Sequence, residues 1–367
     1  MTAGTPAELP NPFQFEDGSH VCTAAHWQRR RQEISELIVE KEYGGLPPAS
    51  ISTRFEVLHA GELKGPPGAR ILSGRVVTGP EHPFAFLLQL LVPPGDGPFP
   101  VVLTGDACWR YATDAVIAAV LGRGCILAQF NRVEIAPDAG ISDRTTGIYP
   151  VYSKLRFGAL AAWAWGYHRC VDVLANMAFV DAAHIAITGH SRGGKAVLLA
   201  GATDERIALT CANNSGAGGA GCFRWQGPAC ETLADLLRSF PYWFGPDMQA
   251  FANREAELPF DQHFLKALIA PRGLLTTEAL GDLWANPTGT WQTHLAAREV
   301  YRLLGAEERI GIWYRDGGHD HGLADWRAFL DYLEGQFFGH APQHCYDRNP
   351  YPELQPAFSW KAPGVRE

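Results

Sequence analysis

The sequence predicts an α/β fold in which a mostly parallel central sheet lies between two helical layers, a three-layer sandwich. From about residue 99 onward, short apolar runs alternate with longer helix-forming runs, which is the order of right-handed strand–helix–strand crossovers. The 367 residues are 46% hydrophobic and 19% charged, an ordinary composition for a protein with a large core. We expect a single catalytic domain over residues 1–367, with an N-terminal extension of helix and strands over residues 1–95.

The N-terminal extension is expected to begin with a polar helix. This helix covers about residues 24–40, starts near Thr23 and stops before the Gly- and Pro-rich residues 43–48. Three strands follow, at residues 52–59, 69–78 and 84–92.

The alternating region supplies the parallel part of the sheet. Strands are expected at residues 99–103, 125–129, 185–188, 207–211, 273–277 and 310–314, and helices at residues 112–121, 160–175 and from 196. The segment 216–264 is long and aromatic, so we expect it to contain short helices that cover the site. Ligands of such folds bind where the carboxyl ends of the strands meet.

Charge and composition argue against several classes of partner. The net charge is −8, and no basic run is longer than the three arginines at 29–31, which disfavours nucleic-acid binding. No stretch approaches 18 consecutive apolar residues, which disfavours a membrane span. The first 30 residues lack the order of a signal peptide, so we expect either a cytoplasmic protein or one whose leader has been removed. The eight cysteines are widely spaced, without a Cys-x-x-Cys pair, so neither a disulfide framework nor a cysteine metal site is predicted.

The most informative motif is Gly189-His190-Ser191-Arg192-Gly193, between an apolar strand and a helix-forming run. A nucleophilic serine on a sharp strand-to-helix turn needs small residues two places before and after it, because the backbone passes closely there. Gly189 and Gly193 meet this need, so the motif predicts a nucleophile elbow and an α/β-hydrolase fold. The competing interpretation is an ordinary strand-to-helix loop with a capping serine.

A serine nucleophile requires a histidine base that is oriented by a carboxylate, in the chain order serine, acid, histidine. His319 and His321 follow the last predicted strand and are both candidates for the base. Their His-x-His spacing also resembles a metal site, but no third ligand is evident, so no metal or other cofactor is predicted. Asp282 is the preferred acid and Glu278 the alternative. Residues 106–110 are expected to border the same pocket.

These pieces together resemble the glucuronoyl esterases, carbohydrate esterases of the α/β-hydrolase superfamily that cleave esters between lignin alcohols and the glucuronic acid of xylan. The similarity covers nearly the whole chain, and its most specific element is the arginine directly after the elbow serine. The matching strings are residues 42–48, 189–195, 204–210, 214–219, 240–244, 270–274 and 318–321.

The resemblance implies a role for each matching residue. Ser191 is the nucleophile, His321 the base as the second histidine of His-x-His, and Arg192 helps to hold the oxyanion. Residues that match groups contacting the sugar or the uronate are Lys195, Glu231 and Trp284.

The chain departs from the family pattern at the acid. Many members carry glutamate where this chain has Asn214, and an amide has no charge with which to stabilise imidazolium. Some bacterial members instead use an aspartate two residues before the tryptophan, and Asp282 and Trp284 reproduce that arrangement.

The function expected from this resemblance is hydrolysis of 4-O-methyl-glucuronoyl-type esters through an acyl-enzyme, with a small-molecule or oligosaccharide ester as partner. The family also favours a secreted or periplasmic location. Two alternatives stay open. One is a carboxylesterase or acetyl esterase of the same fold, and the other is a non-catalytic carbohydrate-binding relative.

Overall fold

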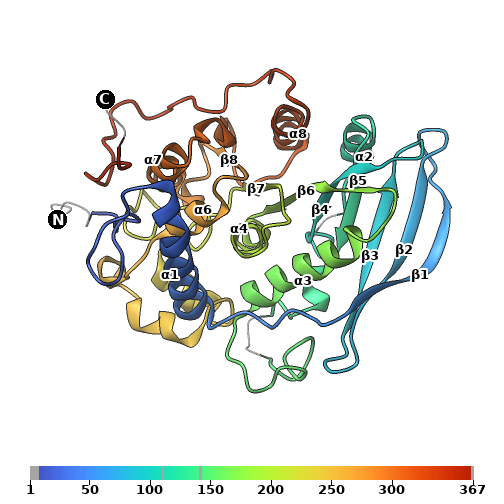
Figure 1. The fold of residues 1–367 in the computed structure, drawn as a ribbon, viewed down its shortest axis with the longest axis horizontal. Helices are drawn as coiled ribbons and strands as arrows, with labels where there is room; N and C mark the ends of the chain where they lie inside the picture. The colour runs from blue at the N-terminus through green and yellow to red at the C-terminus, as the bar shows by residue number, and fades with distance from the viewer. Residues whose placement is uncertain (1–7, 110, 140–142, 365–367) are drawn as a thin grey trace.

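A nine-stranded sheet forms the centre of the molecule, in the order β1-β2-β3-β5-β4-β6-β7-β8-β9. The structure is a computed structural model that describes residues 8–109, 111–139 and 143–364. Figure 1 shows the sheet crossing the molecule with helices on both sides. Every neighbouring pair from β5 to β9 in this order is parallel, so the predicted α/β fold with a mostly parallel sheet is confirmed.

The N-terminal extension contains the expected helix and three strands. Helix α1 spans Ala24–Tyr43, and its first turn is capped by the side chain of Thr23. It ends at Gly44, whose φ of 71° is left-handed and where a Cβ would lie 2.6 Å from the carbonyl oxygen of Arg156. Strands β1 (Thr53–Glu62), β2 (Arg70–Thr78) and β3 (Ala85–Val92) form an antiparallel end of the sheet that joins β5.

The six remaining strands form the parallel part. They are β4 (Phe99–Thr104), β5 (Ile126–Phe130), β6 (Val180–His190), β7 (Leu209–Asn213), β8 (Gly273–Ala279) and β9 (Ile310–Arg315). Every residue of β5, β7 and β8 is buried, as expected for strands covered on both faces. Strand β6 starts five residues earlier than the expected position 185 and leads directly into the elbow.

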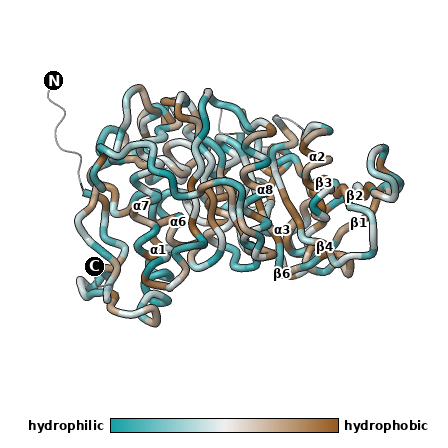
Figure 2. The backbone as a smooth tube through the Cα atoms, turned by 90° about the horizontal axis from the view of Figure 1, so that it is seen from above, coloured by the Kyte–Doolittle hydropathy of each residue, from teal (hydrophilic) through white to brown (hydrophobic). Residues whose placement is uncertain are grey.

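Alternate residues of the strands face two different cores. On β4, Val101 and Leu103 pack in one core, whereas Val102 packs in the other. The first core contains residues of five helices: α1, α3 (Ala159–Leu174), α4 (Arg192–Thr203), α6 (Gln262–Ile269) and α7 (Pro287–Leu303). The second core contains residues of α2 (Asp114–Leu121) and α8 (Leu323–Phe338). Because helices pack on both faces of the sheet, the fold is a three-layer sandwich. Figure 2 shows that its hydrophobic segments run through the middle of the molecule. Helices α7 and α8 are not among the helices expected from the sequence.

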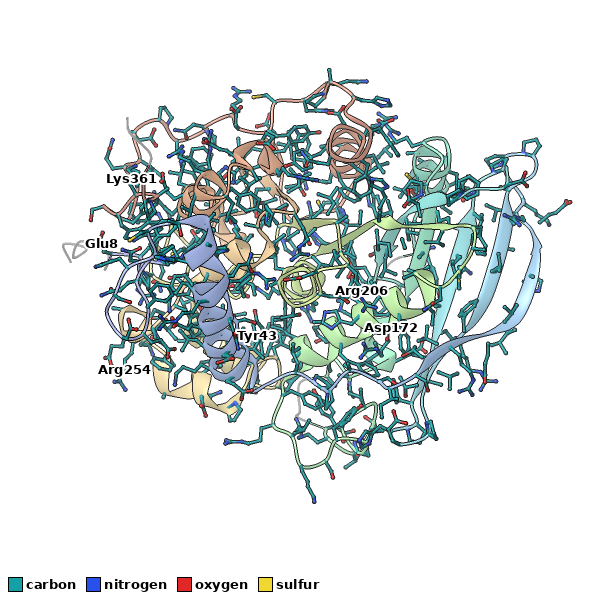
Figure 3. The ribbon with its side chains drawn as sticks, in the orientation of Figure 1. Glu8, Tyr43, Asp172, Arg206, Arg254 and Lys361 are labelled. Atoms are coloured by element: carbon teal, nitrogen blue, oxygen red, sulfur yellow. The ribbon has the colours of Figure 1, made fainter. Side chains whose placement is uncertain are left out.

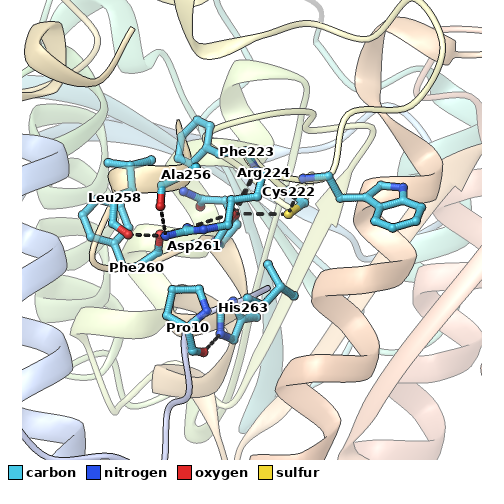
Figure 4. A network of polar contacts seen from close by, with 12 residues as sticks. Pro10, Cys222, Phe223, Arg224, Ala256, Leu258, Phe260, Asp261 and His263 are labelled. Carbon is cyan, nitrogen blue, oxygen red and sulfur yellow. Dashed lines mark hydrogen bonds and ion pairs between the residues drawn. The ribbon is translucent and has the colours of Figure 1, made fainter. Parts of the chain in front are cut away.

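The long segment after β7, named here the covering segment, contains short helices, as the sequence predicts, and residues such as Leu236 and Phe244 pack in the first core. It contains α5 (Leu233–Ser239) and two 3₁₀ helices, Pro246–Phe251 and Glu255–Glu257. Its return to α6 is fixed by the buried carboxylate of Asp261, which accepts hydrogen bonds from the backbone N–H groups of Phe223 (2.9 Å) and Arg224 (3.0 Å) (Figure 4). The Arg224 guanidinium donates to the carbonyl oxygen of Phe260 (2.6 Å). The covering segment is therefore held by buried polar contacts.

The two terminal segments lie side by side on one flank. The backbone N–H of Leu9 donates to the carbonyl oxygen of Ala357 (2.9 Å), and Figure 3 places Glu8 and Lys361 on the same side of the molecule. Figure 3 also shows Asp172 of α3 near Arg206, with which it forms an ion pair (2.8 Å).

All eight cysteines lie in the described part of the chain and carry free thiols. Within the same residues, no helix has the length and apolar character needed to cross a bilayer.

Candidate active site

Ser191 occupies a strained turn between β6 and α4. Its φ of 55° and ψ of −122° are unusual for a residue with a side chain, and such strain is typical of functional turns. The two glycines are required by close backbone approach. A Cβ on Gly189 would lie 2.5 Å from the carbonyl oxygen of Gly193, and a Cβ on Gly193 would collide with the carboxylate of Asp106. The strand–turn–helix context of a nucleophile elbow is therefore present.

A buried ion pair supports the elbow from the neighbouring strand. Asp106, just after β4, accepts a hydrogen bond from the backbone N–H of His190 (2.7 Å) and is paired with Arg132. Burial raises the pKa of Asp106, although the Arg132 charge opposes that shift. This arrangement fixes the backbone immediately before the nucleophile.

Ser191 opens onto a cavity of about 450 Å³. Its walls are formed by Asp106, Cys108, Trp109, Arg132, Val133, Asp138, His190, Ser191, Arg192 and His319. The expected residues 106–110 contribute three of these, and Arg110 lies outside the described residues. The size is that of a small-ligand pocket.

His319 is the histidine that meets the acid. Its Nδ1 forms a hydrogen bond with Oδ2 of Asp282 (2.6 Å), and its ring lines the cavity together with Ser191. In the tautomer that donates from Nδ1, the lone pair on Nε2 is left to take a proton from the serine hydroxyl.

His321, the base that the resemblance implies, lies in a different environment from His319. The ring of His321 is buried and stacks against Trp326 (5.1 Å between centroids) and His190 (5.8 Å). It lines a smaller neighbouring hollow of about 70 Å³ at the start of α8. The contact with Asp282 therefore favours His319 as the base, whereas the resemblance implies His321.

Asp282 lies directly after β8 and receives two hydrogen bonds on one oxygen. His319 is one donor, and the side-chain amide of Asn214 is the other (2.7 Å). Burial disfavours the charged form of Asp282, but these hydrogen bonds outweigh burial and keep its pKa below the usual range. Asp282 is therefore the ionised acid that can orient an imidazole.

Glu278, the alternative acid, lies inside β8 and is fully buried. Burial raises its pKa to about 8, and the hydroxyl of Thr290 donates to its Oε1 (3.3 Å). The burial of Glu278 and the contact of Asp282 with His319 favour Asp282 over Glu278 as the acid.

Arg192, the first residue of α4, faces the cavity and is held in a fixed orientation. Its Nη1 donates to Oδ2 of Asp138 (2.9 Å), and its guanidinium lies over the rings of Phe240 (4.8 Å) and Trp243 (4.7 Å). The other carboxylate oxygen of Asp138 accepts from the Tyr242 hydroxyl (2.9 Å) and from the indole N–H of Trp243 (3.1 Å).

Lys195, Glu231 and Trp284 are brought together in one chain of contacts. The ammonium of Lys195, one helical turn after Ser191, donates to Glu231 (3.1 Å) and to the carbonyl oxygen of Ser215 (2.7 Å). The indole N–H of Trp284 donates to the second carboxylate oxygen of Glu231 (3.2 Å). Burial lowers the pKa of Lys195, although Glu231 opposes that shift. Lys195 is buried, whereas Trp284 is half exposed.

Among the residues that the structure describes, there is no group of three or more histidine, cysteine or acidic side chains that could hold a metal ion.

Comparison with known proteins gives a consistent result. The family model described as "Glucuronyl esterase, fungi" matches residues 77–305. The chain belongs to the glucuronoyl esterase family. A curated relative, 4-O-methyl-glucuronoyl methylesterase of Podospora anserina, is 34% identical over 87% of this chain, and the match covers 65% of that relative, just under two thirds of its length.

Two solved structures show the similarity in three dimensions. A carbohydrate esterase family 15 glucuronoyl esterase from Caldicellulosiruptor kristjansonii has a TM-score of 0.85 at 29% identity, covering 99% of both chains. A mutant glucuronoyl esterase from Sporotrichum thermophile, in complex with methyl 4-O-methyl-β-D-glucopyranuronate, has a TM-score of 0.75 at 27% identity, covering 94% of this chain and 92% of that one.

Two site residues of this glucuronoyl esterase family member were missed by sequence reasoning. The sequence identifies Asn214 only as a lost acid, although its amide donates to Asp282. No sequence pattern points to Asp138, because it lies in an irregular segment far from every motif. Its contact with Arg192 joins residues that are 54 positions apart in the chain.

Proposed function

We propose that this protein is a serine esterase that hydrolyses uronate esters of the 4-O-methyl-glucuronoyl type through an acyl-enzyme. The observation that carries the proposal is the hydrogen bond of 2.6 Å between His319 and Asp282, at a cavity that also contains the strained Ser191. A nucleophile, a base and an orienting carboxylate at one rim are the components of acyl transfer.

In the acylation step, His319 takes the proton of the Ser191 hydroxyl through Nε2 while the serine oxygen attacks the ester carbonyl. Asp282 holds the imidazole in the required tautomer and stabilises the imidazolium that forms. The tetrahedral intermediate then collapses, and His319 gives its proton to the departing alcohol. The uronoyl group remains attached to Ser191 as an ester.

In the deacylation step, His319 takes a proton from water, and the resulting nucleophile attacks the acyl-enzyme. The second tetrahedral intermediate then collapses and releases the uronate, while His319 gives its proton back to the Ser191 oxygen. In both steps Arg192 is a fixed cation beside the oxygen on which negative charge develops, together with the free N–H groups of the first turn of α4.

The uronate ring is assigned to the half-exposed face of Trp284, which lies beside Glu231 and outside the wall of the Ser191 cavity. A sugar ring can pack on this aromatic face, and the Glu231 carboxylate, which Lys195 and the Trp284 indole hold in place, can accept a hydrogen bond from a ring hydroxyl. The supporting comparison is the complex of the Sporotrichum thermophile relative with a methyl uronate ester.

The activity is tested by assaying purified protein on methyl D-glucuronate and on an aryl acetate. We expect a higher kcat/KM for the uronate ester, and loss of that activity in Ser191→Ala. Hydrolysis of the aryl acetate alone would point to a general carboxylesterase instead.

A serine-directed phosphonate tests whether the site is catalytic at all. Reaction at Ser191, located by peptide mass spectrometry, is the expected result. A folded sample that does not react would favour a carbohydrate-binding role.

A further inference from the structure

Arg192 forms an ion pair with Asp138, a residue that takes no part in the proton transfers of the proposed reaction. Asp138 lies in the cavity wall, and its side chain is only 12% exposed, against 32% for that of Arg192. The carboxylate is held by the Tyr242 hydroxyl and the indole N–H of Trp243, both neutral donors from the covering segment. Asp138 is therefore a preorganised charge and not a mobile surface group.

The aromatic pair beneath Arg192 completes this arrangement. Phe240 and Trp243 stack with ring centroids 3.9 Å apart and an interplanar angle of 4°. The guanidinium lies over both rings while one of its N–H groups is bonded to Asp138. A guanidinium has five N–H donors, so further donors remain for a ligand oxygen.

The ion pair between Arg192 and Asp138 affects how the product of ester hydrolysis is bound. The acid released from the acyl-enzyme is ionised at neutral pH, and its carboxylate carbon is the former ester carbonyl carbon. It therefore forms beside Arg192, at the place where the oxyanion was stabilised. An unopposed arginine binds carboxylates strongly, so it would retain this product.

We propose that Asp138 is a positioning residue that aims Arg192 at the oxyanion and offsets its charge, so that the free uronate leaves the site after each turnover. The inference rests on the proposed function. The oxyanion of the tetrahedral intermediate carries its charge mainly on one strongly basic oxygen, whereas a carboxylate spreads its charge over two weakly basic ones. N–H donors aimed at one oxygen therefore stabilise the oxyanion of the tetrahedral intermediate. Partial neutralisation of the guanidinium charge by Asp138 weakens the attraction to the product carboxylate.

The test compares a charged and a neutral ligand of the same shape. In a Ser191→Ala background, the dissociation constants of D-glucuronate and of methyl D-glucuronate are measured by isothermal titration calorimetry at pH 7 and low salt. We expect Asp138→Asn to tighten D-glucuronate binding by about three- to tenfold while the affinity for the neutral methyl ester stays nearly the same. In the Ser191 enzyme, the same change lowers kcat and strengthens product inhibition by D-glucuronate.

Two control variants separate this effect from a general change in charge or shape. Asp143→Asn removes one negative charge from an exposed turn of the same segment, where the carboxylate binds Thr145, and is expected to leave both affinities unchanged. In an Arg192→Met background, Asp138→Asn is expected to produce no tightening, because the cation that it unmasks is gone. Asp138→Ala serves as a second neutral variant if the asparagine variant does not fold.

The outcomes are distinguishable. Equal changes for both ligands, or unchanged D-glucuronate affinity, would show that Asp138 only shapes the pocket and would overturn the inference while the proposed function stands. Binding of neither ligand by any variant, together with an inactive Ser191 enzyme, would overturn the proposed function and the inference with it.

Discussion

Strand β8 and the loop that follows it contain two carboxylates four residues apart, Glu278 and Asp282, which differ in protonation. Asp282 lies just past the end of the strand and is kept ionised by donors from two neighbouring loops. Glu278 lies inside the strand, where burial raises its pKa to about 8. The difference teaches that the position of a carboxylate relative to the sheet rim, and not its place in the chain order, decides whether it can act as the acid of a triad.

The residues around Asp282 and those around Glu278 differ in the same way as the two carboxylates. The rim cluster, Ser191, Asp282 and His319, meets a cavity that a substrate can enter. The interior cluster, Lys266, Glu278 and Thr290, is fully buried, and burial lowers the pKa of Lys266 to about 7. We therefore expect changes at the rim to alter the rate and changes in the interior to alter stability.

The largest effect is expected at the base. His319→Ala should lower kcat by about 10⁴-fold or more, because without it neither proton transfer of the acyl cycle has an acceptor. His321→Ala is the matched control, two residues away. It removes a buried ring that stacks on Trp326, so we expect a moderate loss of thermal stability and much smaller loss of rate. The opposite ranking of the two variants in steady-state kinetics would return the base to His321.

The next effect is expected at the acid. Asp282→Asn should lower kcat by about 10⁴-fold, because an amide favours the wrong imidazole tautomer and does not stabilise imidazolium. Glu278→Gln, the same chemical change four residues earlier, should leave kcat nearly unchanged. Measuring both rates on one uronate ester tests the comparison directly, and a larger loss in the glutamate variant would exchange the two roles.

Much of the fold could be predicted from the sequence because its signals are local. The run of buried strands, the glycines around Ser191 and the cap of α1 each depend on neighbours in the chain. Helices α7 and α8 were missed, although both bury apolar faces against the sheet. The end of β1 extends three residues further than expected, to Glu62, because pairing with β2 decides where it stops.

The site was predicted less completely, because its decisive contacts join distant segments. Sequence reasoning found two histidines on one loop, but only the path of that loop past β8 selects His319. Asp282 is preferred because it follows the strand expected at residues 273–277, and the resemblance adds its distance from Trp284; the structure brings this residue to a histidine. It had no signal for Asp138, which is 54 residues before Arg192 in the chain.

The interior cluster yields a prediction about stability and pH. Glu278 has a folded-state pKa of about 8, above its unfolded value, so the folded protein binds more protons at this carboxyl group, and the contribution of Glu278 to stability falls as pH rises from about 5 toward 8. Glu278→Gln should remove this contribution, so that stability rises more steeply with pH than in the wild type, and should raise the free energy of unfolding at pH 6 by about 1–2 kcal/mol. Urea unfolding between pH 5 and 6 measures the change, in a range where Lys266 is still mostly charged. A variant whose stability keeps the wild-type slope would place the titrating group elsewhere.

The smallest effect is expected at Asn214, which supplies the second hydrogen bond to Asp282. Asn214 has a φ of 41°, so Asn214→Gly removes the amide without adding the strain that another side chain would meet there. Loss of this donor should raise the pKa of Asp282 and lower kcat by about two- to tenfold. Because the carboxylate is then protonated more easily, the loss should be greatest on the acid side of the pH–rate profile and should fade toward pH 8. A loss as large as that of Asp282→Asn, and equal at every pH, would mean that Asn214 itself takes part in the proton transfers.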